Sequence, residues 1–236
     1  MLDQIEETKF AALRKNCHNL GVPSPPEVFI NMKVVESDGR VSRDEKFRAH
    51  SWTRNFYNWM FMTAGDAGGD GSNDFSAGKM SARRTDGTIN DSNYAPYRGH
   101  YASDGGFYQT ALSPLFGVQV GTGATAFDHD DYKLAAPIWS GTGSGHLSYH
   151  AHTSFGIKSY TGTTWKNIIT RIMDNDSGAL ISVAETGLVW SGYLCSDTLY
   201  YYLMERNVLT SAVDVANGAR LTVTYEISMD FSTPDA

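Results

Sequence analysis

The sequence predicts a mainly β protein, built as an antiparallel β-sandwich of the jelly-roll-like kind. The clearest evidence is residues 220–231, RLTVTYEISMDF, in which apolar and polar side chains alternate strictly from Leu221 to Phe231. Such alternation is typical of a strand with one buried and one solvent face in an antiparallel sheet. Several other apolar runs lie at short spacing earlier in the chain, and this spacing favours a sandwich. The composition agrees, with 23 glycines, 12% aromatic residues and only 19% charged residues.

The N-terminal segment predicts a helix. In MLDQIEETKFAALRKN the acidic residues come first and the basic residues later, which suits the helix dipole. Gly21 and the following VPSPP stop the pattern. We therefore expect an N-terminal helical arm over residues 1–26, ahead of a single sandwich domain over 27–236. The segment has no apolar secretion core, so we expect no signal peptide.

A strand and a second helix are expected next. EVFINMKVV, residues 27–35, alternates as a strand does, and ESDGR supplies a turn. Ser42 and Glu45 form a capping-box pattern, S-x-x-E, which predicts one internal helix near 43–62. Its apolar positions share a helical stripe and favour core packing: Phe47, Trp52, Phe56, Trp59 and Met60.

Residues 63–114 show no helix or strand periodicity and are predicted to be a long insertion rich in Gly and Tyr. Aperiodic stretches of this length are unusual inside a compact domain and often bind something. Tyrosines and phenylalanines recur along it, so we expect it to be ordered by contact, including contact with neighbouring copies.

The C-terminal half contains the remaining strands. LFGVQVG and ALISVAETGLVW are predicted as strands, and HLSYHAHTSFGI alternates as a strand does. LYYYLMERNVL is an apolar run with a charged break, and WKNIITRIM is ambiguous. VANGAR, residues 215–220, contains the Asn-Gly pair that is typical of a β-hairpin turn.

Charge and hydropathy restrict the partners. The net charge is −7, and no basic cluster exceeds Arg83 and Arg84, so a direct nucleic-acid partner is not expected. No apolar run approaches the ~18 residues of a membrane span, so no membrane partner is expected either. Cys17 and Cys195 are far apart in the sequence and are expected to be lone buried thiols.

The stretch VGTGATAFDHDDYKL, residues 120–134, raises the question of a phosphate or metal site. A phosphate loop needs a lysine in register and a following helix, and both are missing. A calcium loop needs a spacing of acids that this stretch lacks. GGDGSNDF at 68–75 resembles one G-G-x-G-x-D calcium repeat, but its sixth position is Asn73 and such repeats need stacked copies, so a plain glycine loop is favoured. The favoured interpretation is a connection between strands, in which Gly121 and Gly123 permit the turn and Asp128 and Asp130 bind its backbone.

The sequence nominates no catalytic residue and no cofactor. GTGSG at 141–145 misses the nucleophile-elbow register, and a distant carboxylate pair for glycoside cleavage stays open. His150 and His152 lie two apart on an alternating segment, which is a weak alternative metal site. Hydrogen-bonded histidines are the favoured interpretation, so we expect no metal.

Four segments together resemble structural virion proteins of tailed bacteriophages. These segments are SWTRNFYNWMFM, GVQVGTGATAFDHDDYKLAAPI with its G-T-G turn and D-Y-x-L, ISVAETGLVW with E-T-G-L, and LMERNVLTSAVDVANGARLTVTYEIS. The likeness covers about 27–62 and 115–231, and the Gly-rich segment departs from it. The resemblance implies a non-enzymatic β-sandwich that assembles as symmetric multimers in the virion, at the neck, collar or tail, or as capsid decoration. Its partners would be copies of itself and other virion proteins, assembled in the cytoplasm of the host bacterium.

Aromatic residues are the expected interface, because such side chains dominate interface energetics. The candidates are Trp52, Trp59, Tyr94, Tyr97, Tyr101, Phe107 and Tyr108. Two alternatives remain: an adhesin module that binds a host-surface glycan through the same aromatic loop, and a metal-dependent jelly-roll enzyme that uses the two histidines.

Overall fold

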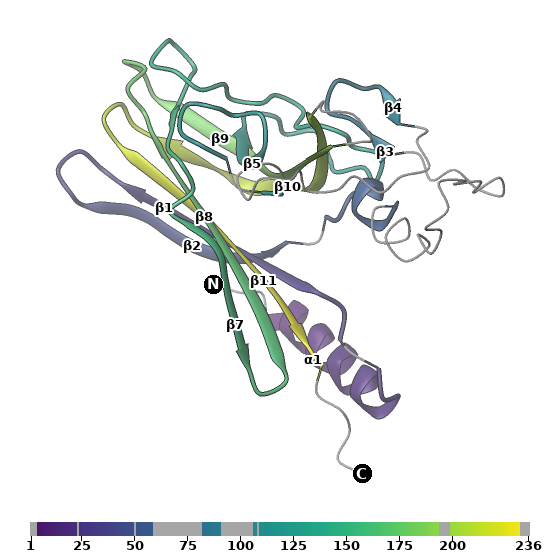
Figure 1. Cartoon of the computed structure of the whole chain (residues 1–236). Helices are drawn as coiled ribbons and strands as arrows, with labels where there is room; N and C mark the ends of the chain where they lie inside the picture. The colour runs from purple at the N-terminus through teal and green to yellow at the C-terminus, as the bar shows by residue number, and fades with distance from the viewer. Residues whose placement is uncertain are drawn as a thin grey trace.

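The computed structural model describes residues 4–22, 24–49, 51–58, 82–90, 106–107, 109–193 and 199–231. It is mainly β, with two antiparallel sheets packed face to face as a β-sandwich, as the sequence predicts (Figure 1). Among the described residues, no helix is long and apolar enough to cross a membrane.

The larger sheet has six strands. In order they are β2 (Val41–Ala49), β1 (Glu27–Val35), β11 (Arg220–Asp230), β8 (Thr164–Asp174) and β6 (Ser148–Tyr149), and β7 (Ser154–Thr161) also pairs with β8. The smaller sheet has the order β10 (Leu199–Val215), β9 (Ile181–Tyr193) and β5 (Gly117–Gly121). A separate pair joins β3 (Ala82–Arg83) to β4 (Ile89–Asn90).

The core lies between the two sheets. On β11, Leu221, Val223, Tyr225 and Ile227 are buried while the residues between them are partly exposed, which is the alternation read from the sequence. They pack with Val28 to Val34 of β1 and with apolar residues of β5, β9 and β10 in one cluster. The ambiguous segment WKNIITRIM lies within β8, which pairs with β11 over eleven residues.

The internal helix is much shorter than predicted. Residues 41–49 form β2, which pairs with β1, and only 54–58 are helical; residues 59–62 lie outside the described part. The capping-box prediction is wrong because the period here is two. Exposure alternates along the first part of β2: Arg43 and Glu45 are partly buried, whereas Asp44 and Lys46 are exposed. The side chains of Arg43 and Glu45 also pair with each other, so they lie on the same face. Charged residues on an edge strand hid this alternation, and such charges also protect an open sheet edge.

The Asn-Gly turn is present but it does not close a hairpin. Gly218 has a φ of 81°, the left-handed conformation that glycine adopts without strain. However, β10 before the turn pairs with β9, and β11 after it pairs with β1 and β8. The turn therefore carries the chain from one sheet to the other.

The single strand predicted over HLSYHAHTSFGI is also broken in two. Residues 150–153 separate β6 from β7, and both strands pair with β8. The reason is that His152 is buried and bonds to backbone outside the sheet, as described below.

Helix α1 (Gln4–Asn19) contains no fully buried residue and is attached mainly by charge. Figure 1 shows it beside the end of the larger sheet that is farther from β5 and β9. Arg48 of β2 is buried between the rings of Phe10 and Phe29, 3.9 and 4.4 Å from their centres, and its guanidinium donates to Glu7 at 2.6 Å and to Glu27. The domain boundary predicted near residue 26 stays a prediction.

Replacing Arg48 with Ala is expected to release α1 while the sandwich stays folded. The variant loses the contacts with Glu7 and Glu27, the longer ion pair with Glu6 at 3.7 Å and the ring stack, and a free helix of this length is marginal in water. We expect the amides of α1 to exchange about tenfold faster or more, which corresponds to ~1.4 kcal/mol, in native-state hydrogen exchange. Arg40→Ala is the control, because Arg40 is exposed and 4.0 Å from Asp38. Equal protection of α1 in both variants would refute the clamp.

Candidate functional site

Three of the four segments that carry the phage resemblance meet at one buried place. Gly121 and Gly123 follow β5, Glu185 of E-T-G-L lies on β9, and Arg206 lies on β10. Arg206 Nε donates to Glu185 Oε2 at 2.7 Å, and both side chains are at most 1% exposed. We call this pair and the backbone around it the Glu185–Arg206 centre.

Glu185 is surrounded by backbone donors. Its Oε1 accepts the amides of Gly123 at 3.2 Å and Ala136 at 2.8 Å, and its Oε2 accepts the amide of Ala135 at 3.0 Å. Three amides and one guanidinium compensate the desolvation of this carboxylate. The side chain therefore holds both ends of the loop from residue 122 to 136.

Arg206 holds the middle of the same loop. One terminal nitrogen donates to Asp131 Oδ2 at 2.7 Å, and the other donates to the carbonyl of Thr125 at 2.9 Å. The loop has few backbone partners of its own, so the guanidinium supplies donors that a neighbouring strand would otherwise supply. The chain itself therefore supplies partners for both charged side chains of the centre.

The four predicted turn residues have different roles. Gly121 and Gly123 do not have positive φ angles. A Cβ at either position would lie 2.4 or 2.5 Å from Glu185 Oε1, so these glycines make room for the carboxylate. Asp128 accepts the amide of Asp130 at 2.8 Å and so caps the turn, whereas the carboxylate of Asp130 pairs with Arg54.

Two of the seven aromatic interface candidates lie in the described part. Trp52 is half-buried, stacks on Phe56 with ring centres 3.8 Å apart, and forms a bridge with Glu205. Phe107 is also half-buried and packs against the same core clusters. The structure thus gives both residues contacts within their own chain, and an interface role for them stays a prediction. The other five candidates, Trp59, Tyr94, Tyr97, Tyr101 and Tyr108, lie outside the described residues.

The two histidines of the weak metal alternative have separate partners. His150 Nε2 is 2.7 Å from Asp174, and the ring is 45% exposed. His152 is buried; its Nε2 accepts the amide of Val118 at 3.2 Å, and its Nδ1 lies 3.1 Å from the carbonyl of Gln109, to which Nδ1–H donates in the matching tautomer. Burial, reinforced by the nearby Arg171 charge, lowers the pKa of His152 to about 3, so the ring is neutral. Within the described ranges, no three His, Cys, Asp or Glu side chains are grouped to hold a metal ion.

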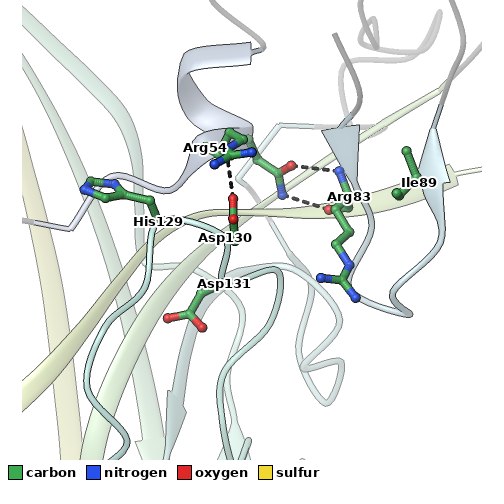
Figure 2. Close-up of a pocket in the computed structure, with 7 residues that line it drawn as sticks. Arg54, Arg83, Ile89, His129, Asp130 and Asp131 are labelled. Atoms are coloured by element: carbon green, nitrogen blue, oxygen red, sulfur yellow. Dashed lines mark hydrogen bonds and ion pairs between the residues drawn. The ribbon is translucent and has the colours of Figure 1, made fainter. Parts of the chain in front are cut away.

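A pocket of about 200 Å³ lies beside the Glu185–Arg206 centre. Figure 2 shows Arg54 pointing at Asp130, which it meets at 2.8 Å. The side chain of Asn55 exchanges two hydrogen bonds with the backbone of Arg83, both of 2.8 Å. The guanidinium of Arg83 stacks on Tyr132 at 3.8 Å. Arg54 and Arg83 thus both contact residues of the loop 122–136, and these contacts help to hold the loop in place.

The surface also contains an apolar groove of about 300 Å³ that no sequence motif predicts. Leu115 and Trp139 line it and are 42% and 52% exposed, with Pro114, Pro137 and Ile138 between them. Asp86 and Lys133 also line the groove. We call this feature the Trp139 groove. In the sequence, the feature that marks this groove is Trp139 itself, which follows Pro137 and Ile138 in a connection between strands.

Beside Arg206, Glu205 points into the core and accepts a hydrogen bond from the Tyr225 hydroxyl at 2.8 Å. Its other oxygen, Oε1, has no partner among the described residues. Burial raises the pKa of Glu205 to about 8, although the Tyr225 bond and the Arg206 charge oppose this. Glu205 is therefore mostly protonated at neutral pH.

Replacing Gly123 with Ala is expected to destabilise the fold by about 1–3 kcal/mol. The new Cβ would lie 2.5 Å from Glu185 Oε1 and 2.6 Å from the Cβ of Ala135, so the centre must open. Urea unfolding monitored by circular dichroism measures the change. Gly143→Ala is the control, because its nearest neighbour would be His146 at an ordinary 3.6 Å. An unchanged midpoint for Gly123→Ala would contradict the role of this glycine.

Replacing Glu205 with Gln is expected to flatten the stability profile between about pH 4.5 and pH 8. Because the folded pKa of about 8 exceeds the ordinary 4.5, the folded state binds more protons, and stability falls as pH rises through this window. The slope approaches roughly 1.4 kcal/mol per pH unit, and the neutral amide removes it. The free energy of unfolding, measured at each pH unit from about pH 5 to about pH 9, tests this expectation. Glu226→Gln, which affects a carboxylate paired with Lys46 and Lys166, serves as the control. Parallel profiles for wild type and Glu205→Gln would exclude a protonated Glu205.

No family model, no curated protein and no solved structure matches the chain. The residues and contacts described above therefore carry the functional proposal.

Proposed function

We propose that this chain is a non-enzymatic structural component of a tailed-phage virion, assembling as symmetric multimers at the neck, collar or tail. The observation that carries the proposal is the Glu185–Arg206 centre. Three segments that resemble phage virion proteins supply it: the G-T-G turn, the E-T-G-L strand and the arginine-bearing strand. Their shared pattern has one physical explanation, which is the construction of a rigid loop.

The saturation of the charged groups supports a role in packing. Glu185 accepts from four donors, and Arg206 donates to two carboxylates and to loop carbonyls. A catalytic carboxylate needs a free lone pair or a transferable proton facing a substrate. Here these groups are spent on the backbone, as suits a subunit whose mechanism is shape.

The surface also supports assembly. Leu115 and Trp139 are exposed in the Trp139 groove, and Leu112, three residues before Leu115, is 71% exposed. Exposed apolar patches of this kind mark protein contacts more often than solvent-facing surface. Partner proteins of the same particle, including other copies of this chain, are the partners that the proposal implies.

The proposal predicts that the chain is part of purified particles. Mass spectrometry of virions from a phage that encodes it is expected to detect the chain in several copies per particle. Gold-labelled antibodies viewed by electron microscopy are expected to mark the neck, collar or tail.

A label spread over the capsid shell would instead assign the chain to capsid decoration. Purified particles that lack the chain would refute the proposal. Binding of the isolated chain to host-surface glycans, with the label at the tip of a fibre, would favour the adhesin alternative.

A further inference from the structure

The contact between α1 and the larger sheet joins two complementary surfaces of the same chain. The guanidinium of Arg48 donates to Glu7 of α1 at 2.6 Å and lies 3.9 Å from the centre of the Phe10 ring. Arg14 of α1 forms an ion pair with Glu27 of β1. Arg48 is 3% exposed, so the helix and the sheet together exclude water from it. We call the three residues on the sheet side of this contact the Arg48 clamp: Glu27, Phe29 and Arg48.

The clamp holds α1 by its side chains, and the core of the sandwich does not include the helix. None of the described helical residues, Gln4–Asn19, is fully buried, and none of them belongs to the hydrophobic core clusters. Figure 1 shows the helix beside the larger sheet and away from the smaller one. Every copy of the chain has the same helix and the same clamp. The clamp of one copy therefore fits α1 of another copy as closely as it fits its own.

A short connection joins α1 to the sheet. The helix ends in a left-handed cap at Gly21, whose φ is 67°, and the amide of Ser24 already donates to the carbonyl of Asp230 at 3.2 Å. Residues 20–23 thus form the hinge between the helix and the larger sheet. A Cβ built at Gly21 would meet nothing within 4 Å, so the chain has room to leave the cap in another direction. Short hinges favour the exchange of a terminal element between identical chains.

Two apolar residues in this hinge are exposed. Leu20 is 76% exposed and Val22 is 45% exposed, one on either side of Gly21. In a single copy these side chains contribute little, because an apolar group stabilises a protein by being removed from water. When two copies exchange their helices, the two hinges cross near the axis that relates the copies, which brings both pairs of apolar side chains together. The exchanged pair therefore keeps the contacts of the clamp and adds an apolar contact at the hinge.

We propose that two neighbouring copies exchange α1, so that the helix of each copy docks in the Arg48 clamp of the other. A copy's own helix competes for its clamp at an effective concentration in the mM range, because the linker is short. Exchange therefore prevails where the copies are already held together, as in a multimer. The inference rests on the self-assembly in the proposed function, and it names the element that joins one copy to another.

Photochemical cross-linking between chains of two isotope compositions tests the exchange. Phe10 is replaced by p-benzoylphenylalanine, which keeps an aromatic ring next to Arg48 and reacts on irradiation with the atoms that it touches. Equal amounts of unlabelled chains and chains labelled with heavy nitrogen are unfolded together and refolded, and the multimer is isolated and irradiated. Mass spectrometry then identifies the peptides that join α1 to β1 or β2. We expect about half of these adducts to be mixed, joining an unlabelled to a labelled peptide, because half of the pairs contain one chain of each kind.

Matched variants separate this contact from other contacts between copies. Arg48→Ala in the photoreactive chain removes the clamp and is expected to lower the yield of mixed adducts about tenfold, whereas Arg40→Ala, which changes an exposed arginine, is expected to leave it unchanged. Leu20→Asp places charge at the crossed hinges and is expected to lower the yield about tenfold. Leu180→Asp, at another exposed leucine, is expected to leave it unchanged. Circular dichroism and a cooperative unfolding transition establish that each variant is folded.

The possible failures are distinguishable. A multimer in which every adduct joins peptides of one isotope composition would overturn the exchange and leave self-assembly standing. An unchanged yield in Arg48→Ala would overturn the clamp as the docking site, and an unchanged yield in Leu20→Asp would overturn the hinge contact. A wild-type chain that stays monomeric at high concentration would overturn both this inference and the self-assembly of the proposed function, whereas presence in the particle is decided separately by mass spectrometry of virions.

Discussion

The ion pair between Arg206 and Glu185 is the interaction on which one side of the sandwich depends. It joins β10 to β9 inside the protein, and it is also the anchor for residues 122–136, which have little regular structure. Loss of one partner of a buried pair leaves the other charge without compensation, at a cost of about 3–5 kcal/mol. The pair is tolerated because every strong bond that these two side chains need is supplied by the loop itself. The loop therefore needs the ion pair to stay in place, and the buried ion pair needs the hydrogen bonds of the loop to be stable.

Buried arginines solve the same problem in three places. Arg206 holds the loop after β5, Arg171 holds the loop before it, and Arg48 holds α1. Irregular backbone near a core leaves carbonyl groups without strand partners, and unpaired buried carbonyls are costly. A guanidinium has five donors in a fixed plane and stays charged, so a single side chain satisfies several carbonyls or carboxylates at once. This explains why a sandwich with few charged residues places several of them inside.

The regular strands were predictable from the sequence, and the irregular parts were not. Alternation in β11 and β1 reports directly which face is buried, so their bounds follow from the residues. β2 was mistaken for a helix because its alternating side chains are charged and a capping-box pattern lies across them. The centre does not follow from the sequence because its members lie on separate elements: Gly123 and Glu185 are 62 residues apart, and Glu185 and Arg206 are 21 residues apart. Gly121 and Gly123 were noticed for backbone freedom, whereas their function depends on a carboxylate that only the fold brings near.

Charged side chains lie inside this protein and several leucines lie on its surface, and this arrangement affects the cost of binding a partner. Ordering a flexible side chain or loop on binding costs about 0.5–1.5 kcal/mol for each side chain, and this cost reduces the affinity that apolar contact provides. The Arg171 loop and the Glu185–Arg206 loop border the Trp139 groove and are already fixed by buried donors, and the Arg48 clamp fixes α1 likewise. A partner that met such pre-ordered pieces would meet a shape that the fold has already fixed, and the buried charges that fix it would then lower the cost of association.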